Sequence, residues 1–268
     1  MKRLHGLKFI IFLLFVNLLL NGCVRWEKVS IKPEELRNNP TVLISPFKSA
    51  PITIKSWGGI GSFMLLGPLG IHMIDAVTKE GKDQVAEALN KIYGGWDPSM
   101  ELANVCKKLL KENKKTKIKE INIIESRELP NITDLRSEEP NLFSSKPMMG
   151  AVTVSVAGRW MNKGKEWYDN NNITIQHNKN STQMNADWVL EVFSSFSLIT
   201  EGEEMGLNVL IKLYDNNTGK LLAKGVLGDF AVEIPNSDEK FDFKEHYRLI
   251  GRRLCSTILT EMGLLQGQ

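Results

Sequence analysis

Side chains that could form a catalytic site are few in this sequence and lie far apart. Residues 45–48 and 237–240 each place a serine three residues before a lysine, a spacing that can activate the serine for acyl transfer. That chemistry also needs SDN and KTG motifs elsewhere, and the sequence contains neither. HExxH, GxSxG, the phosphate-binding P-loop and the complete dinucleotide-binding glycine pattern do not occur either. We therefore expect no enzyme activity and no cofactor.

Residues that could bind a metal are equally dispersed. Beyond the first 22 residues the histidines are His72, His177 and His246, which are widely separated. There is no CxxC pair, and no histidine lies near Cys106 or Cys255 in the sequence. The sequence predicts no metal site.

The most specific chemical signal is the cysteine at position 23. Residues 1–8 carry three basic side chains and no acid, and residues 9–20 are almost wholly apolar. Twelve helical residues cover about 18 Å, whereas a bilayer core needs about 20 residues. The segment therefore predicts a signal peptide, and Cys23 follows it directly in the sequence Leu-Asn-Gly-Cys.

This cleavage region resembles the lipobox of bacterial lipoproteins, which reads Leu, a small residue, Gly or Ala, then Cys. The resemblance implies that residues 1–22 are removed and that Cys23 becomes the acylated N-terminus, which anchors the protein to membrane lipid. Asn21 departs from the pattern, so an ordinary secretory signal with an incidental Cys23 is the alternative. Because residue 24 is Val and not Asp, the resemblance implies the periplasmic face of the outer membrane. The outer leaflet of the inner membrane is the alternative location.

Loss of the leader would change the net charge. The chain has 34 basic and 31 acidic residues, and three of the basic ones lie in residues 1–22, so both numbers become 31 (34 − 3 = 31). A neutral chain without a long basic block does not indicate a nucleic-acid partner. The lysines clustered in residues 107–119 are typical of a solvated helix end, with contact to anionic lipid headgroups as the alternative.

Cys106 and Cys255 would remain as one pair of thiols in an exported chain. Both occur beside the apolar stripes of predicted helices. If the two helices cover the same face of a sheet, the sulfurs could meet and form a disulfide in an oxidising compartment. Two buried free thiols that act as small apolar residues are the alternative.

The mature chain is predicted to contain one domain, residues 41–268, after a polar lipidated tether over 23–40. Residues 57–77 are apolar and rich in glycine, which favours a buried loop, with contact to lipid or to another subunit as the alternative. Asp97 and Pro98 form a preferred N-cap and first residue of a helix.

The second half of the chain changes its hydrophobic period to two. Four segments alternate apolar and polar residues: 151–160, 187–199, 206–215 and 220–228. An exposed, Asn-rich loop is expected between the first two, over 161–185. The alternation predicts an α+β domain with a mixed, largely antiparallel sheet and helices packed on one or both faces. An amphipathic helix over 243–262 is expected to cover the sheet.

Several segments resemble the periplasmic α/β domain shared by the curli-secretion lipoprotein, the lipoprotein activators of penicillin-binding proteins and the TolB amino-terminal domain. They are a short strand ending in Pro-Phe, VAEALNKIY, ADWVLEV and the hairpin VLIKLYDNNTGKLLAKG. The resemblance covers residues 41–262, with 57–77 and 161–185 as departures. It implies helices against a mixed sheet and contacts with other proteins, without catalysis. We expect no membrane pore, since no pair of long membrane hairpins is evident.

These observations support a membrane-anchored periplasmic lipoprotein that acts as a non-catalytic assembly or regulatory subunit of a cell-envelope complex. An envelope protein is the expected partner. The sequence leaves open whether the chain forms an oligomer. A binding module for a small envelope ligand, a lipid or a peptidoglycan fragment is the alternative, and it would need a concave pocket. A hydrolase is a third hypothesis, and it would need Ser, His and carboxylate side chains to converge.

Overall fold

A computed structural model describes residues 26–55, 83–84, 86–113, 117–138, 141–144, 156–173, 186–199, 204–233 and 243–266. The predicted leader, Cys23 and the Gly-rich segment 57–77 lie outside these residues. The elements, in chain order, are η1 (Pro33–Glu35), β1 (Thr41–Pro46), β2 (Ile52–Lys55), α3 (Pro98–Glu112), β3 (Glu120–Ile123), α4 (Thr133–Glu138), β4 (Phe143–Ser144), α5 (Val156–Asp169), β5 (Trp188–Ile199), β6 (Glu204–Asp215), β7 (Leu221–Glu233) and α6 (Phe243–Glu261). Residues 86–93 are also helical.

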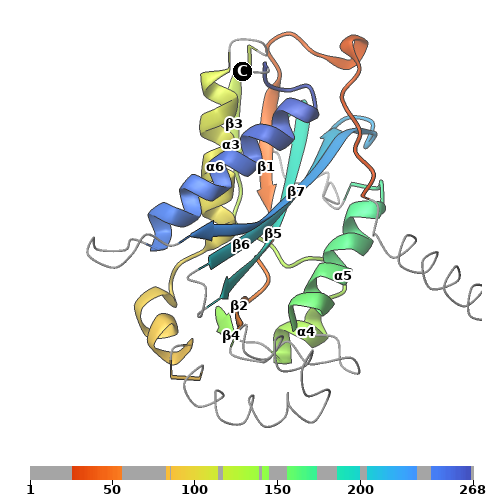
Figure 1. The fold of residues 1–268 in the computed structure, drawn as a ribbon. Helices are drawn as coiled ribbons and strands as arrows, with labels where there is room; N and C mark the ends of the chain where they lie inside the picture. The colour runs from red at the N-terminus through yellow and green to blue at the C-terminus, as the bar shows by residue number, and fades with distance from the viewer. Residues whose placement is uncertain are drawn as a thin grey trace, which may run out of the picture.

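Strand β5 is the centre of the sheet (Figure 1). Its first half pairs with β1 and its last three residues pair with β2, while β6 pairs along its whole length. Because β6 occupies one edge of β5, strands β1 and β2 must share the other edge, one after the other. β3 extends the sheet beyond β1, β4 beyond β2, and β7 beyond β6.

The prediction of a largely antiparallel sheet is wrong. β1, β2, β3, β4 and β5 all pair in parallel, and among the strands that the structure describes only β6 and β7 add antiparallel ladders. The period-two pattern did identify β5, β6 and β7 as strands. It says nothing about pairing direction, and the parallel strands β1 to β4 are only two to six residues long, too short to show a period.

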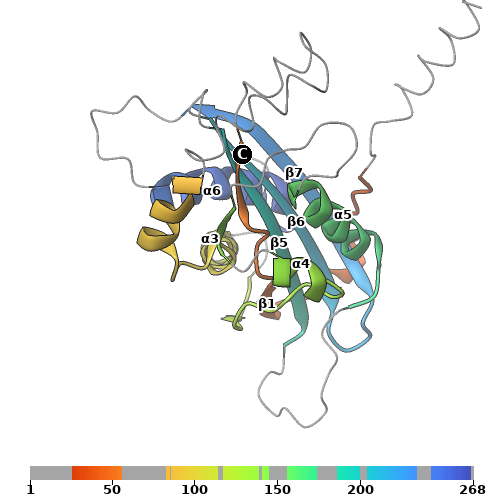
Figure 2. The same cartoon turned by 90° about the horizontal axis from the view of Figure 1, so that it is seen from below.

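Helices cover both faces of the sheet (Figure 2). On one face α3 and α6 cover Trp188, Leu190 and Val192 of β5, as the alternation predicted. On the other face α5 covers Phe193 of β5 and Leu210 of β6. Helices on both faces are one of the two arrangements that the sequence left open.

The polar excursion predicted over 161–185 begins as a helix. α5 spans Val156–Asp169, so it also replaces the end of the strand predicted over 151–160. Trp160, Trp167 and Tyr168 are buried against the sheet, and their spacing of seven and eight residues is a helical spacing. Gly164 completes this face, because a Cβ atom there would lie 2.6 Å from Cε1 of Phe193.

The described part of the predicted tether, residues 26–40, packs on the domain instead of standing free. Val29 forms a β-bridge with Lys224, and Ile31 is buried in the core. Arg37 forms ion pairs with Asp187 and Asp215 at the start of β5 and the end of β6. Apolar and basic residues within this segment therefore hold it against the sheet.

Candidate functional site

Helix α3 starts where its sequence predicts. The carboxylate of Asp97 accepts hydrogen bonds from the backbone N–H groups of Ser99 and Met100, and Pro98 is the first helical residue. The hydroxyl of Ser99 accepts a hydrogen bond of 2.7 Å from the backbone N–H of Ser49, just beyond β1. The N-terminus of α3 is thus fixed near the carboxyl end of a parallel strand.

Helix α6 confirms the amphipathic helix predicted near the C-terminus. Every residue of the predicted apolar stripe is buried: Phe243, Tyr247, Ile250, Leu254, Ile258 and Met262. The turn after the helix contains Gly263 in the left-handed region, with φ of 82°. Because this apolar stripe faces the core, the opposite side of α6 faces solvent.

Helices α3 and α6 pack side by side and in parallel. Gly251 lies against Leu102, since a Cβ atom at 251 would be 2.6 Å from Cδ2 of Leu102. One turn further along each helix, the thiols of Cys106 and Cys255 are in hydrogen-bond contact. Both pairs are separated by 149 residues (251 − 102 = 255 − 106 = 149). A constant separation shows that the two helices run in the same direction.

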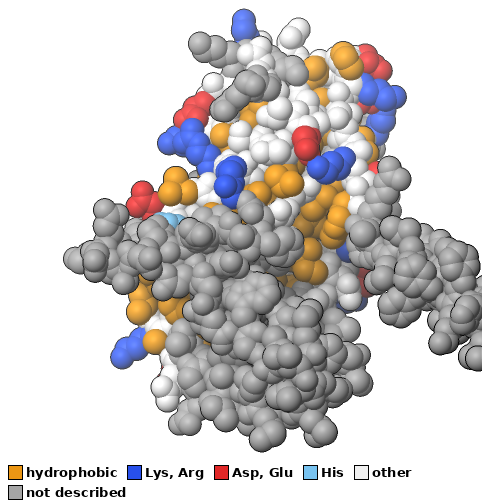
Figure 3. Space-filling model, in the orientation of Figure 1, with side chains coloured by type: hydrophobic (Ala, Val, Ile, Leu, Met, Phe, Trp, Pro, Cys, Tyr) orange, Lys and Arg blue, Asp and Glu red, His pale blue; other side chains and the backbone are white. Residues whose placement is uncertain are grey.

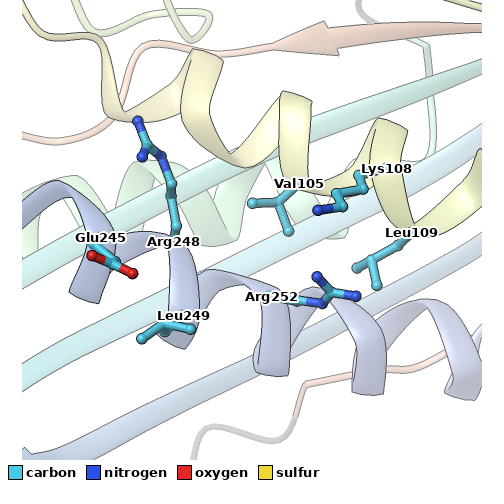
Figure 4. A pocket seen from close by; sticks show the side chains of 7 residues that line it. All are labelled: Val105, Lys108, Leu109, Glu245, Arg248, Leu249 and Arg252. Carbon is cyan, nitrogen blue, oxygen red and sulfur yellow. The ribbon is translucent and has the colours of Figure 1, made fainter.

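A groove with a volume of about 400 Å³ lies on the solvent side of this helix pair (Figure 4). We call it the α3–α6 groove. It is lined by Val105, Lys108, Leu109, Glu245, Arg248, Leu249 and Arg252. Val105 and Leu109 project from α3 towards α6, and Arg252 reaches from α6 towards α3 (Figure 4). Leu249 is 59% exposed, which is unusual for a leucine on a helix that buries its apolar stripe.

Three cations and one acid line the α3–α6 groove. The guanidinium of Arg248 holds Glu101 in a fork, at 2.7 and 3.2 Å, and Arg252 pairs with Glu112 at 3.1 Å. Both arginine side chains are half exposed. Exposed ion pairs contribute about 0–1 kcal/mol, so an incoming carboxylate could exchange with Glu101 or Glu112 at little cost. Figure 3 shows basic side chains beside apolar ones over the part of the surface where α3 and α6 lie.

A second, smaller pocket of about 250 Å³ lies beside the start of α3. Its lining residues include Lys48, Trp96, Glu128, Arg136 and Asn141. Glu128 pairs with Lys48 at 2.9 Å and with Arg136 at 3.2 Å, and Asp97 also lines the pocket, so two acids balance the two cations. The pocket exposes polar and apolar surface in equal measure, and its volume is below the roughly 300–1,000 Å³ typical of ligand sites.

Buried hydroxyl groups link the start of α3 to β5 and α6. The Ser49 hydroxyl contacts those of Ser99 and Ser194, and Ser194 contacts Tyr247 at 3.4 Å. Burial raises the pKa of Tyr247, so its hydroxyl keeps its proton. A nucleophilic serine needs a neighbouring base, whereas these hydroxyls contact one another. They act as structural links between elements.

Beneath α5, Lys212 of β6 and Glu191 of β5 have fully buried side chains, with Nζ and Oε2 3.9 Å apart. The ammonium donates hydrogen bonds of 2.8 and 2.9 Å to the backbone carbonyls of Trp167 and Asn170 at the end of α5. Desolvation lowers the pKa of Lys212 to about 8, against the opposing effect of Glu191. This pair fixes the C-terminal end of α5 on the sheet, where a cation complements the helix dipole.

The structure separates the serine–lysine spacings noted in the sequence. The buried Ser45 hydroxyl accepts a hydrogen bond of 2.6 Å from Arg127, whereas Lys48 pairs with Glu128. These contacts do not make Lys48 a base for Ser45. Residues 237–240, His72 and His177 lie outside the described residues, while His246 lies on α6. Across the described ranges no group of three or more His, Cys, Asp or Glu side chains could hold a metal ion.

Sequence reasoning did not identify the α3–α6 groove. It placed Cys106 and Cys255 on helices that could share a face, and the structure brings them together as buried free thiols. Lys108 was noted only as part of a lysine cluster. Leu249 lies off the apolar stripe of α6. A leucine on the polar side of a predicted helix was the sequence signal that could have indicated the groove.

The described residues define an α/β domain with helices on both faces of a mostly parallel sheet and a groove between two helices. No protein-family model matches the sequence, and no curated protein matches it. A solved structure of the PelC dodecamer from Paraburkholderia phytofirmans aligns at 9% identity with a TM-score of 0.31, covering 90% of this chain and 97% of that chain. A substituted variant of the same dodecamer aligns over the same shares at 9% identity and a TM-score of 0.37. Scores this low do not establish a shared fold, so they carry no information on function.

None of the described helices combines the length and the apolar character that a bilayer span requires.

Proposed function

We propose that this protein is a lipid-anchored, non-catalytic subunit of a cell-envelope complex, and that it binds an acidic, amphipathic segment of a partner protein in the α3–α6 groove. The anchor is proposed at Cys23, on the periplasmic side of the outer membrane, from the lipobox-like sequence alone. The resemblance to envelope lipoprotein domains stays a prediction.

The observation that carries the docking proposal is the pairing of apolar and basic groups in one groove. Val105, Leu109 and the exposed Leu249 offer an apolar strip, flanked by Lys108 and Arg252. A helix with leucines on one face and acidic residues beside them matches this arrangement, because amphipathic helices bind grooves through residues at helical spacing. Complementary charge also steers association and selects the partner.

Photo-cross-linking in intact cells tests the docking proposal. A photoreactive residue at position 249 should give one discrete cross-linked species, whereas the same residue at Ile92, which is 69% exposed and outside the groove lining, should give none. The charge-reversed variant Lys108→Glu, Arg252→Glu should remove the cross-link. Equal cross-linking at both positions, or cross-linking unaffected by charge reversal, would contradict the proposal.

A synthetic helix gives the matching test in vitro. A labelled peptide with Leu and Glu at helical spacing should bind the purified protein more tightly than its Lys-substituted counterpart, and its affinity should fall as salt is raised. Equal affinity for both peptides would exclude charge complementarity as the basis of recognition.

The lipid anchor has a separate test. Mass spectrometry of the mature N-terminus should find Cys23 as the first residue with acyl groups attached. Cys23→Ser should release the protein from membranes. A mature protein that begins elsewhere, or a Cys23→Ser variant that still sediments with membranes, would refute the anchor without affecting the groove.

The smaller pocket beside Trp96 supports a second candidate, a module that binds one neutral sugar unit, such as one peptidoglycan sugar, because about 250 Å³ leaves no room for a larger ligand. Its balanced charges, an aromatic side chain and Asn141 suit a hydroxylated ligand. Calorimetric titration with N-acetylglucosamine oligomers tests it, with Asn141→Asp as the variant. No heat of binding at millimolar sugar would remove this candidate.

A further inference from the structure

The two cysteines of the folded domain occupy the interface between α3 and α6. Cys106 on α3 and Cys255 on α6 are both fully buried, and they are free thiols in the structure. Their side chains are in hydrogen-bond contact with each other. The sequence placed both cysteines near apolar stripes, but it could not show that they meet.

The packing of the helices explains why they meet. Gly251 has no side chain where α6 crosses α3, and a Cβ atom there would lie 2.6 Å from Cδ2 of Leu102, so the Leu102 side chain packs directly on the backbone of α6. Cys255 and Cys106 lie one turn beyond this crossing, at the same 149-residue separation. A disulfide needs Cα atoms about 4.4–6.8 Å apart, and close helix approach of this kind favours such a separation.

We propose that Cys106 and Cys255 form an interhelical disulfide in the mature protein. In the reaction, both S–H bonds break and one S–S bond forms, with loss of two protons and two electrons. The oxidant is a second disulfide, of a thiol–disulfide oxidase or a small-molecule disulfide, which is reduced to two thiols. Formation of the bond in the cell rests on the proposed export, because disulfides persist in oxidising compartments.

Burial determines when this bond can form. The neighbouring Cys106 and desolvation together raise the pKa of Cys255, so little thiolate exists in the folded protein. Exchange requires a thiolate and access of the oxidant. The bond must therefore form while the chain is still folding and α3 and α6 can separate. Once the helices close over it, the same burial should protect it from reductants.

Thiol counting on the full-length protein tests the proposal. Protein extracted from membranes is quenched in acid, unfolded, and alkylated before and after reduction, and the masses of the peptides with Cys106 and Cys255 are measured. We expect no alkylation at either position before reduction, one adduct at each afterwards, and a linked peptide pair. Alkylation of both Cys106 and Cys255 before reduction would overturn the proposal for the cellular protein.

A second arm separates this proposal from that of export. The full chain with Cys23→Ser, purified reduced, is unfolded and refolded with oxidised glutathione, or folded first and then exposed to the same reagent. We expect the linked pair in the first case and at least tenfold slower formation in the second. Failure of the pair to form during refolding would overturn the disulfide itself. If the disulfide forms in vitro but is absent from cells, the proposal that it forms on export is overturned. The ability of Cys106 and Cys255 to form the bond would still stand.

Stability gives a readout that does not depend on alkylation. The midpoint of urea unfolding should fall when the oxidised protein is reduced, and the double variant Cys106→Ala, Cys255→Ala should show no such change. An unchanged midpoint on reduction would contradict a disulfide that links two elements of the fold.

Discussion

Lys212 should make the stability of this protein rise with pH over a defined range. Its ammonium is fully buried under α5, and desolvation lowers its pKa to about 8 from 10.5. Between these values the unfolded chain binds a proton at this site that the folded protein does not. The free energy of unfolding therefore increases as pH rises, because stability increases with pH wherever the unfolded state binds more protons.

The size of the effect follows from the gap of about 2.5 between the two pKa values (10.5 − 8). That gap corresponds to about 3 kcal/mol in total, of which about 2 kcal/mol falls between pH 8 and pH 10. Burial raises the pKa values of Tyr168 and Tyr214. Their ionisation in the unfolded chain lowers stability above about pH 10, and ionisation of Cys255, whose folded-state pKa is also raised, does so from about pH 8.5. The measurement should therefore stop at pH 10 and use the protein with Cys106→Ala and Cys255→Ala.

Urea unfolding at pH 8, 9 and 10 measures this slope. Lys212→Met should flatten it, whatever that substitution does to the absolute stability. Lys220→Met is the matched control, because Lys220 is exposed at the β6–β7 turn and pairs with Glu35. A slope that is absent when Lys212 is present, or that persists in Lys212→Met, would refute the reasoning.

Further substitutions test the packing, the helix start and the groove. Gly225→Ala should lower the free energy of unfolding by about 1–3 kcal/mol, since its Cβ would lie 2.6 Å from Cγ2 of Ile258; Gly95→Ala, with no atom within 4 Å, is the control. Asp97→Ala should cost about 0.5–2 kcal/mol in chemical denaturation, through loss of the cap on α3. Leu249→Asp should leave the melting temperature unchanged but reduce binding of the acidic peptide at least tenfold.

Local signals in the sequence predicted single elements well. The Asp97–Pro98 start of α3 and the apolar stripe of α6 were recognisable because caps and stripes depend on neighbouring residues. Gly219, with φ of 68°, lies in the turn that joins β6 to β7, as expected for the hairpin VLIKLYDNNTGKLLAKG. These features need no knowledge of the rest of the fold.

Features that depend on distant segments were not predictable in this way. The direction of β1 relative to β5 depends on segments 146 residues apart (188 − 42 = 146), and no periodicity encodes it. α5 was misread because its polar residues dominate its sequence, while Trp160 and Trp167 face β5 and β6. The α3–α6 groove was unpredictable for the same reason, because Lys108 and Arg252 become neighbours only when α3 and α6 pack together.

The parallel arrangement of α3 and α6 follows from the strand directions. β1 is parallel to β5, β6 is antiparallel to β5, and β7 is antiparallel to β6, so β7 runs in the same direction as β1. α3 starts beside the carboxyl end of β1, and α6 follows β7, so both helices begin at the same end of the sheet and return along it (Figure 1). The α3–α6 groove and the contact between Cys106 and Cys255 therefore have one cause. A substitution that widens the crossing at Gly251, such as Gly251→Leu, should disturb peptide binding and thiol pairing together, whereas Leu249→Asp should disturb peptide binding alone.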